Sequence, residues 1–243
     1  MSRNAAVAAA RADIPLVLDL ERVSVVPFRG SSDVLLLDTQ RPGETPSEEF
    51  RTLRTRLEQL QSTRAVQTVL VTSPSPGDGK SFTAANLALA EAQLADNPTL
   101  LCDFDLRKPI LHRVFQIDRS PGISDYLLGK ADLPEVLRRI GNSNLFVMPA
   151  GEAVNDPLEL LHLKEVRRLM DWLRNAFRWI LLDSPPLLVA SDANLLAALA
   201  DGTLLVTKIG ATTLDSLGRA IESLAPDSIL GVVANGTASI GNR

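Results

Sequence analysis

The sequence predicts an α/β domain of three layers, in which helices cover both faces of a mostly parallel central sheet. From Gln67 onward, short apolar runs alternate with helical segments, an order typical of parallel sheets. Four of these runs are apolar at consecutive positions, as expected for strands that are buried on both faces. A glycine-containing loop directly follows the first run and opens a helical segment. These observations together predict the fold class.

The elements follow from the spacing of apolar residues and turn formers. The predicted strands span residues 67–73, 99–103, 144–148, 178–183, 202–208 and 229–234. The predicted helices span residues 80–95, 157–176, 190–200 and 213–225, with shorter helices near 107–116, 123–129 and 133–140. The chain has 243 residues, of which 45% are hydrophobic and 22% are charged. This length and composition suit a globular domain with a sizeable core.

The chain divides into two parts of unequal regularity. Residues 1–44 lack sustained periodicity and are predicted to form a variable N-terminal extension. Two short apolar runs within it, Ile14–Leu20 and Val34–Leu37, are candidates for added strands or for docking on the domain. Residues 45–243 form the predicted domain.

The domain begins with a predicted helix over residues 45–61. Thr45 is a candidate N-cap, with an acid, Glu48, at the position of a capping box. Glu48, Arg51 and Arg54 are spaced by three and therefore lie along one face of the helix. On spacing alone, a solvated charged face is the preferred interpretation.

Composition narrows the functional classes. The formal net charge of −4 gives no reason to expect nucleic acid as the main partner.

Cys102 is the single cysteine, so no internal disulfide is possible and a reducing cytoplasm is the simplest setting. Its apolar surroundings favour a core role over a reactive thiol. No apolar stretch approaches the ~20 residues of a membrane-spanning helix, so we expect a soluble, cytoplasmic protein.

The loop after the first strand has the pattern of a phosphate loop. Residues Thr72–Ser81 read Thr-Ser-Pro-Ser-Pro-Gly-Asp-Gly-Lys-Ser, between a predicted strand and a predicted helix, as such loops require. Pro74 replaces the first glycine of the usual pattern. Backbone N–H groups of the loop would surround the phosphates, Lys80 would supply a positive charge, and the Ser81 hydroxyl would bind Mg²⁺. The predicted nucleotide-binding residues are Pro76, Gly77, Asp78, Gly79, Lys80, Ser81 and Phe82. The sequence thus predicts a P-loop NTPase that binds ATP.

Acidic residues end two later strands. Asp103 and Asp105 follow the run at 99–103, and Asp183 ends the run at 178–183. Because ligands of parallel sheets bind beyond the carboxyl ends of the strands, these carboxylates are placed to hold Mg²⁺. For Asp183 a metal role is strongly favoured. For Asp103 and Asp105, spacing leaves metal binding and turn capping equally open.

A hydroxyl acceptor would need a general base. Asp105 is the best placed candidate, since two carboxylates near one metal can divide metal binding and proton transfer between them. His112 and His162 lack partner patterns for metal or triad chemistry and are predicted to be structural or exposed.

Four segments resemble the bacterial tyrosine kinase family of capsule and exopolysaccharide assembly, part of the deviant P-loop ATPases. The segments are Ser47–Arg54, Thr72–Ser81, Cys102–His112 and Ile180–Pro186, with weaker matches at Gly122–Leu128, Pro149–Gly151, Asp156–Leu161 and Ser191–Ala193. The resemblance spans about residues 45–236. Its most specific part is the Asp-x-Asp-x-Arg segment, because ordinary P-loop enzymes lack it.

The resemblance implies a role for each matching residue. Lys80 and Ser81 would hold Mg-ATP, while Asp103 and Asp183 would position the metal. Asp105 would assist the hydroxyl of an acceptor tyrosine. The implied activity is that of an ATP-dependent protein-tyrosine kinase that regulates polymerisation and export of an exopolysaccharide.

The resemblance also implies partners. In this family the face of Glu48, Arg51 and Arg54 makes subunit contacts in a homo-oligomeric ring, so contacts between chains replace the solvated face as the preferred interpretation. Such kinases are activated by the cytoplasmic tail of a membrane-embedded chain-length protein, which would bring the chain to the inner face of the cytoplasmic membrane.

The tyrosine content departs from the family pattern. Members usually end in a tyrosine cluster that receives phosphate, whereas this sequence holds one tyrosine, Tyr126, inside a predicted packed helix. We therefore expect the chain to phosphorylate other proteins in trans, or to retain ATP-driven assembly without kinase output.

Two alternative functions belong to other classes. One is a kinase-inactive ATPase that acts as a scaffold of the polysaccharide export machinery. The other is a partition or division-site positioning ATPase, a group with a signature lysine five residues before the P-loop lysine; Ser75 occupies that position and argues against it. A dinucleotide-binding oxidoreductase is disfavoured because the third glycine of its fingerprint is missing.

Overall fold

A computed structural model of the chain describes residues 18–28, 36, 47–162 and 164–236. The helices are α2 (Ser47–Thr63), α3 (Lys80–Glu91), α4 (Leu111–Val114), α5 (Ile123–Leu127), α6 (Pro157–Leu161), α7 (Lys164–Ala176), α8 (Asp192–Ala197) and α9 (Leu214–Glu222), with 3₁₀ turns η2 (Leu20–Arg22), η3 (Leu133–Val136) and η4 (Pro226–Ser228). The strands are β1 (Val25–Val26), β2 (Thr68–Thr72), β3 (Thr99–Asp103), β4 (Arg138–Ile140), β5 (Leu145–Met148), β6 (Trp179–Asp183), β7 (Gly202–Lys208) and β8 (Ile229–Asn235).

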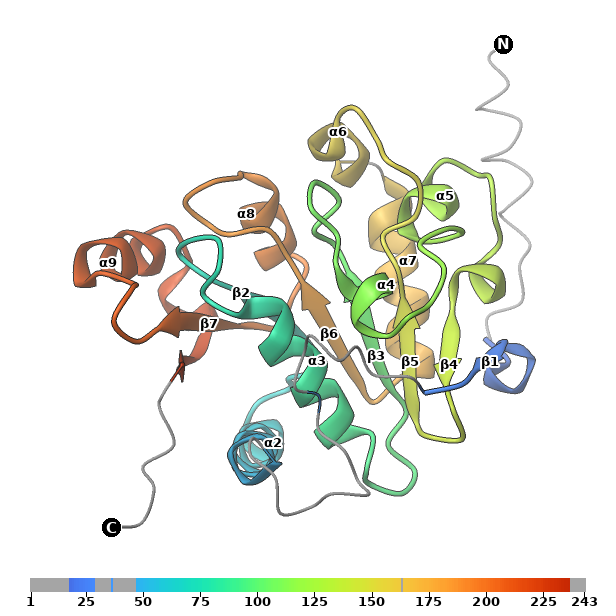
Figure 1. The fold of residues 1–243 in the computed structure, drawn as a ribbon, viewed down its shortest axis with the longest axis horizontal. Coiled ribbons are helices and arrows are strands. Elements are labelled where there is room, and N and C mark those ends of the chain that lie inside the picture. The colour runs from blue at the N-terminus through green and yellow to red at the C-terminus, as the bar shows by residue number, and fades with distance from the viewer. Residues whose placement is uncertain (1–17, 29–35, 37–46, 163, 237–243) are drawn as a thin grey trace.

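The eight described strands form one sheet in the order β1-β4-β5-β3-β6-β2-β7-β8 (Figure 1). Neighbouring strands run parallel except for the antiparallel β4–β5 pair. The order places β6 between β2 and β3, so that three strands predicted to end in functional residues lie side by side. The predicted α/β class with a mostly parallel sheet is confirmed.

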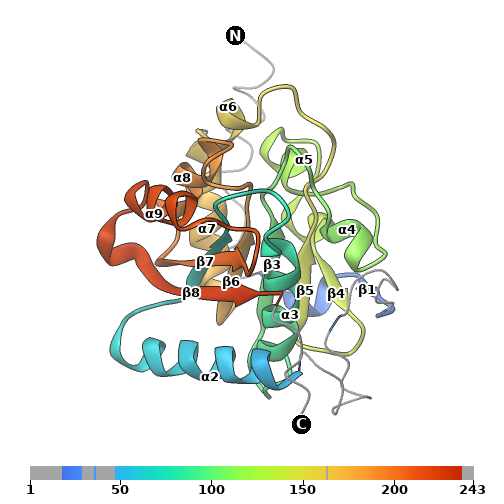
Figure 2. The same ribbon diagram turned by 60° about the vertical axis from the view of Figure 1, so that its left-hand side comes forward.

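Helices cover both faces of the sheet, as the apolar runs without alternation predict (Figure 2). Consecutive residues of a strand point to opposite faces. Thus Leu100 belongs to a core shared with α5, α7 and α8, whereas its neighbour Leu101 belongs to a core shared with α2, α3 and α4. A third, smaller cluster packs α9 and α8 against β7. The sheet is therefore the middle of three layers.

One helix prediction is wrong. Residues 133–140 form the 3₁₀ turn η3 and then the strand β4, which pairs with β5 through Arg138↔Val147 and Arg139↔Phe146. The Arg139 guanidinium lies 5.7 Å from the centre of the Phe146 ring. Pairing with β5 and this stacking outweigh the local helix propensity of the segment.

Several other helix predictions differ from the structure in extent. The helix expected over residues 157–176 is divided into α6 and α7, and α6 ends at the C-cap His162. The helix expected near 107–116 shortens to α4, because the residues before it form a loop around two carboxylates described below. The helix α3 ends at Glu91 rather than residue 95, and α8 and α9 are shorter than the predicted 190–200 and 213–225.

Part of the predicted N-terminal extension joins the domain. The strand β1 pairs with β4 at the edge of the sheet, and Leu18, Leu20 and Leu36 pack against the two large cores. The predicted N-cap at Thr45 and most of the apolar runs at 14–20 and 34–37 lie outside the described residues.

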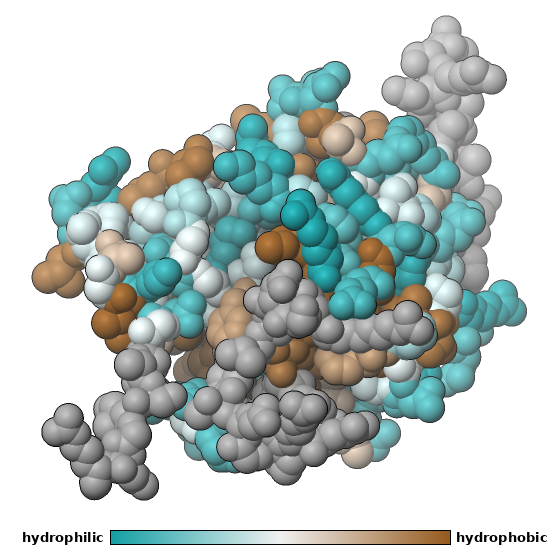
Figure 3. Space-filling view, in the orientation of Figure 1, coloured by the Kyte–Doolittle hydropathy of each residue, from teal (hydrophilic) through white to brown (hydrophobic). Residues whose placement is uncertain are grey.

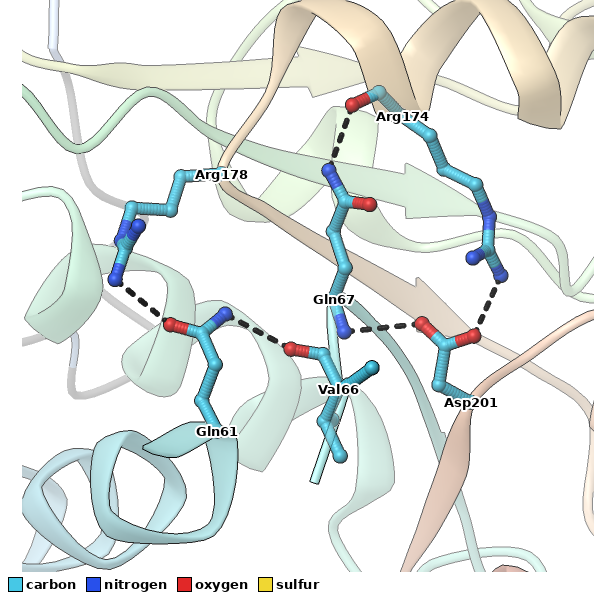
Figure 4. A pocket seen from close by; sticks show the side chains of 7 residues that line it. Gln61, Val66, Gln67, Arg174, Arg178 and Asp201 are labelled. Carbon is cyan, nitrogen blue, oxygen red and sulfur yellow. Dashed lines mark hydrogen bonds and ion pairs between the residues drawn. The ribbon is translucent and has the colours of Figure 1, made fainter. Parts of the chain in front are cut away.

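The amino ends of β2, β6 and β7 meet in a polar cluster beside a hollow of about 380 Å³ (Figure 4). Asp201 accepts hydrogen bonds from the backbone N–H groups of Gln67 (2.9 Å) and Thr68 (2.7 Å) and from Arg174 Nη2 (2.8 Å). The Gln67 amide donates to the carbonyls of Arg174 and Phe177. These bonds fix the start of β2, the strand that leads into the phosphate loop.

The described part of the face in Figure 3 is mostly hydrophilic, and its apolar residues form separate patches. Among the described residues, no helix combines the length and apolar character needed to cross a membrane.

Candidate active site

The phosphate loop joins β2 to α3 and depends on two glycines in the left-handed region. Gly77 has φ of 86° and Gly79 has φ of 99°, conformations that favour glycine. A Cβ on Gly79 would lie 1.8 Å from Asn235 Nδ2. Lys80 is the first residue of α3, so the loop leads directly into the positive end of that helix.

Contacts from distant residues hold the loop at Asp78. Its Oδ2 accepts a hydrogen bond from Ser75 N (2.9 Å) and its Oδ1 accepts one from Thr212 Oγ1 (2.9 Å). Asn235 Nδ2 donates to the Asp78 carbonyl (2.9 Å). Sequence analysis did not identify Thr212 and Asn235, because they lie 134 and 157 residues from Asp78 and belong to no motif.

Lys80 forms ion pairs with two of the three predicted carboxylates, Asp105 and Asp183. Asp103 and Asp183 are paired in register at the ends of the adjacent strands β3 and β6. Lys80 Nζ donates to Asp105 Oδ2 at 2.9 Å and lies 3.6 Å from Asp183 Oδ1. Burial alone would lower the pKa of Lys80, but Asp183 and Asp105 outweigh it and the pKa is raised. The lysine therefore remains charged and neutralises the carboxylates in part.

Two of these carboxylates are fully buried and carry oxygens without hydrogen-bond partners. Asp103 Oδ2 accepts from Ile110 N (3.0 Å) and Leu111 N (2.9 Å), whereas Asp103 Oδ1 and both oxygens of Asp183 have no such partner. Burial, with the neighbouring Asp183, raises the pKa of Asp103 to about 8. Burial also raises the pKa of Asp183, although Lys80 opposes this shift. Asp103 thus caps a turn with one oxygen and leaves the other available.

The unpartnered oxygens fit a hard cation. Carboxylate and hydroxyl oxygens are the ligands that Mg²⁺ prefers, and it usually binds proteins through one or two carboxylates, nucleotide phosphates and water. Among the described residues, no three or more His, Cys, Asp or Glu side chains are grouped so that they could hold a metal ion by themselves. Asp103, Asp183 and Ser81 are the residues placed to contribute ligands.

Asp105 lies in the loop between β3 and α4. Its Oδ2 accepts from Lys80 and its Oδ1 accepts from Lys108 N at 3.0 Å. Arg107 in the same loop forms a bidentate ion pair with the buried Asp192, at 2.7 and 3.1 Å. The pair joins the Asp-x-Asp-x-Arg segment to the start of α8, a role that sequence analysis did not assign.

Phe82 and the α2 motif lie away from this cluster. The Phe82 ring packs edge-on against Phe50 of α2, with centroids 5.8 Å apart, so its side chain faces the core between helices. Arg51 pairs with Glu48 on an exposed part of α2. Arg54 turns inward, where its Nη1 donates to the carbonyl of Ala90 at 2.7 Å, near the end of α3.

The remaining predictions concern residues outside the site. Cys102 is fully buried and its burial raises the pKa of the thiol, as expected for a core residue. Tyr126 lies on α5 and is 3% exposed, which confirms its predicted packing. His162 is exposed and His112 is half-buried.

Comparisons with known proteins identify the fold and the family. The chain is 36% identical to the tyrosine-protein kinase YwqD of Bacillus subtilis over 197 residues, which cover 80% of this chain and 83% of that protein. It is 37% identical to the putative tyrosine-protein kinase EpsB of Ralstonia solanacearum over 202 residues, 82% of this chain but 27% of the longer relative. The structure matches the kinase domain of the Escherichia coli tyrosine kinase ETK with a TM-score of 0.78 and 26% identity, over 90% and 91% of the two chains.

A more distant neighbour, the cell division ATPase MinD of Pyrococcus furiosus, has a TM-score of 0.57 at 22% identity over 68% and 69% of the two chains, and shows the fold alone. No family model matches the sequence. The P-loop, the paired strand-end aspartates and these kinase relatives agree, and the chain belongs to the bacterial tyrosine kinase family.

Proposed function

We propose that this chain is an ATP-dependent protein-tyrosine kinase that acts in trans on other proteins, in a system that regulates polymerisation and export of an exopolysaccharide. The observation that carries the proposal is the cluster of Lys80, Asp103, Asp105 and Asp183 at the start of α3. It combines one charged lysine with buried carboxylate oxygens that have no hydrogen-bond partner. Such a cluster costs stability unless it binds a ligand.

The nucleotide site consists of the phosphate loop and this cluster. Backbone N–H groups from Gly77 to Phe82, in the loop that begins at Pro76, would surround the phosphates, and Lys80 would turn from Asp105 to the β- and γ-phosphates. Ser81, Asp103 and Asp183 would hold Mg²⁺. When bound, Mg-ATP supplies the transferable phosphoryl group and the metal neutralises charge that develops on it.

Asp105 is the proposed general base. It lies two residues after Asp103 in a loop whose backbone holds its Oδ1. Once Lys80 turns to the phosphates, Asp105 Oδ2 loses its ion pair and becomes free to accept the proton of a tyrosine hydroxyl. The phenolic oxygen then bonds to the γ-phosphorus while the bond from that phosphorus to the bridging oxygen breaks.

The acceptor comes from outside these 243 residues. Tyr126 is the single tyrosine of the sequence, and its burial on α5 keeps its hydroxyl from the site unless α5 unfolds. This burial supports phosphorylation of other proteins. The kinase-inactive scaffold is the second candidate, since a chain without an accessible tyrosine of its own is equally consistent with lost kinase output.

The proposal includes a homo-oligomeric ring and a position at the membrane. The residues on α2 that mediate the ring contacts are Glu48, Arg51 and Arg54. To reach a neighbouring subunit, Arg54 either breaks its hydrogen bond to α3 or bonds to both. The cytoplasmic tail of a membrane-embedded chain-length protein activates the kinase and holds it at the inner face of the cytoplasmic membrane. Replacing all three residues by Ala is expected to reduce the assembly size measured by light scattering, and an unchanged size would remove the ring from the proposal.

Phosphopeptide mass spectrometry tests the kinase activity directly. The purified chain is incubated with Mg-ATP, a tyrosine-containing protein and the cytoplasmic tail of the membrane partner, with Lys80→Met as control. Phosphotyrosine that depends on Lys80 is the expected result. Consumption of ATP without phosphotyrosine would instead establish the scaffold ATPase, and phosphate on Tyr126 would contradict action in trans alone.

A further inference from the structure

A second hollow lies at the same edge of the sheet as the phosphate loop. It has a volume of about 500 Å³ and lies between the end of α5 and the start of α6. Figures 1 and 2 both place α5, α6 and α8 beyond the carboxyl ends of the strands, on the side of the loop between β2 and α3. The mechanism proposed above does not use this hollow.

The hollow combines an apolar floor with an acidic rim. Leu128, Val154 and Leu160 line the floor, and Leu128 is 47% exposed, which is high for a large apolar side chain. Asp156 and Glu159 form the rim, and both are exposed. Among the described residues, neither acid has an ion-pair partner within 4.0 Å.

Hydrogen bonds hold the segment just before Ala153, a residue that lines the hollow, against α5. Ser124 Oγ donates to the Glu152 carbonyl (2.8 Å), and Arg119 Nε donates to the Gly151 carbonyl (2.7 Å). Asp125 Oδ2 accepts from the Gly122 N–H at 2.8 Å. A Cβ on Gly151 would lie 2.4 Å from Ser124 Oγ, so this segment approaches α5 as closely as glycine allows. The chain that leads into the lining of the hollow at Ala153 is therefore fixed in position.

Arg107 connects the hollow to the active site. It lies in the loop of Asp105 and pairs with Asp192 of α8, and α6 packs against α8. The pKa of Arg107 is raised, first by its hydrogen bond to Asp192, with further contributions from the charges of Asp156 and Asp105. Asp156 at the rim and Asp105, the proposed general base, thus both raise the pKa of the Arg107 guanidinium.

The charged side chains around the hollow favour a positively charged ligand. Asp192 neutralises Arg107, and Glu152 pairs with Lys130. Asp156 and Glu159 then leave a surplus of negative charge at the rim. Such a surface favours cations and repels acidic segments.

We propose that the hollow between α5 and α6 binds the acceptor protein, through a segment near its tyrosine that carries an apolar side chain and a lysine or arginine. The apolar side chain fills the floor between Leu128 and Leu160, and the basic residue pairs with Asp156 and Glu159. The inference rests on the proposed kinase function and adds the class of substrate that the site selects.

The test compares two sets of tyrosine peptides. One set carries an arginine at each flanking position in turn, and the other carries glutamate at the same positions. With the full chain, Mg-ATP and the tail of the membrane partner, the best arginine peptide should have a KM roughly tenfold below that of its glutamate counterpart, at similar kcat.

The variant Asp156→Asn with Glu159→Gln should remove this preference and leave phosphorylation of a neutral peptide unchanged. Asn is a good N-cap, so the hydrogen bond that Asp156 accepts from Glu159 N (3.1 Å) at the start of α6 is preserved. Asp215→Asn with Glu222→Gln, on α9, is the matched control and should retain the preference. Equal use of both peptides by the unmodified chain, or a preference that survives in the first variant, would overturn the proposal.

Two further measurements separate the possible failures. Fluorescence anisotropy with a labelled arginine peptide measures docking without catalysis; binding that the Asp156 and Glu159 variant loses supports the hollow even if no peptide is phosphorylated, in which case only the kinase function fails. Light scattering reports the assembly size. A size change in the variant would identify the hollow as an interface between copies and overturn acceptor docking.

Discussion

Carboxylates at the two ends of the central sheet have opposite hydrogen-bonding environments. At the amino end, Asp201 accepts two backbone hydrogen bonds and pairs with Arg174 (Figure 4). At the carboxyl end, Asp183 is fully buried and neither of its oxygens has a hydrogen-bond partner. The first cluster stabilises the start of a strand. The second shares one lysine among several carboxylates and leaves buried oxygens without hydrogen bonds, a condition that proteins keep where a ligand binds.

Replacement of Lys80 at the carboxyl end of the sheet should have the largest effect, and the effect is on nucleotide affinity. Lys80→Met deletes the cation that faces the phosphates and the three carboxylates, so nucleotide affinity should fall at least ~100-fold. Isothermal titration with Mg-ATP measures the loss, with Lys164→Met on α7 as the control. Unchanged affinity and turnover in Lys80→Met would mean that the active site lies elsewhere.

Asp201→Ala should give the largest loss of stability. Two backbone N–H groups and Arg174 would lose their acceptor, and the free energy of unfolding should fall by about 3 kcal/mol. Urea denaturation measures it. Asp201→Asn keeps one carbonyl oxygen as an acceptor and should lose less. Turnover per folded molecule should not change in either variant, and a loss of turnover would contradict a purely structural role for this end of the sheet.

Glu91 is another buried acid, and it lies at the opposite end of α3 from Lys80. It therefore tests how a buried carboxyl behaves without the lysine. Its Oε1 has no partner, and burial, with Glu58, raises its pKa to about 8. Between the ordinary pKa and about 8, the unfolded chain ionises while the folded chain keeps its proton, so the unfolded state gains stability as the pH rises.

From about pH 6 to about pH 8 the unmodified chain should therefore lose about 2 kcal/mol more stability than Glu91→Gln. The variant retains an acceptor for Asn97 Nδ2, which donates to Glu91 Oε2 at 3.2 Å. Denaturation midpoints of both proteins, measured across this pH range, test the expected loss of stability. Parallel curves for the two proteins would show that Glu91 does not keep its proton.

Asp183→Asn should have the smallest effect on stability and the opposite sign. The amide removes a buried charge beside Asp103 and Asp105, so the nucleotide-free chain should gain about 1 kcal/mol while Mg²⁺-dependent turnover is lost. Thermal unfolding with and without Mg-ATP separates the two effects. A variant that is less stable than the unmodified chain would place Asp183 among the structural carboxylates such as Asp201.

Much of the site follows from local sequence. The glycines and Lys80 form a continuous loop, and Asp103 and Asp183 end apolar runs, so strand direction alone places them at one edge of a parallel sheet. Local sequence was insufficient where partners are distant. Thr212 and Asn235 contact the phosphate loop across more than half the chain, and no spacing rule links them to it.

The same reason explains the errors in secondary structure. Residues 138–140 have the composition of a helix, but they pair with β5 because that edge of the sheet is open to them. Arg54 is placed by spacing on a face with Glu48 and Arg51, yet it turns to the end of α3, since the carbonyls there lack partners within the helix.

The sequence by itself determined the α/β class, the phosphate loop, the carboxylates at the strand ends and the burial of Cys102 and Tyr126. These depend on apolar patterning and short motifs, whose physical causes act between neighbours in the chain. Tertiary structure alone decided that β6 lies between β2 and β3, that Asp192 pairs with Arg107, and that a hollow with an acidic rim lies between α5 and α6. Those features arise from contacts between residues that are distant in the sequence, and the packing of the whole sheet determines which of those residues meet.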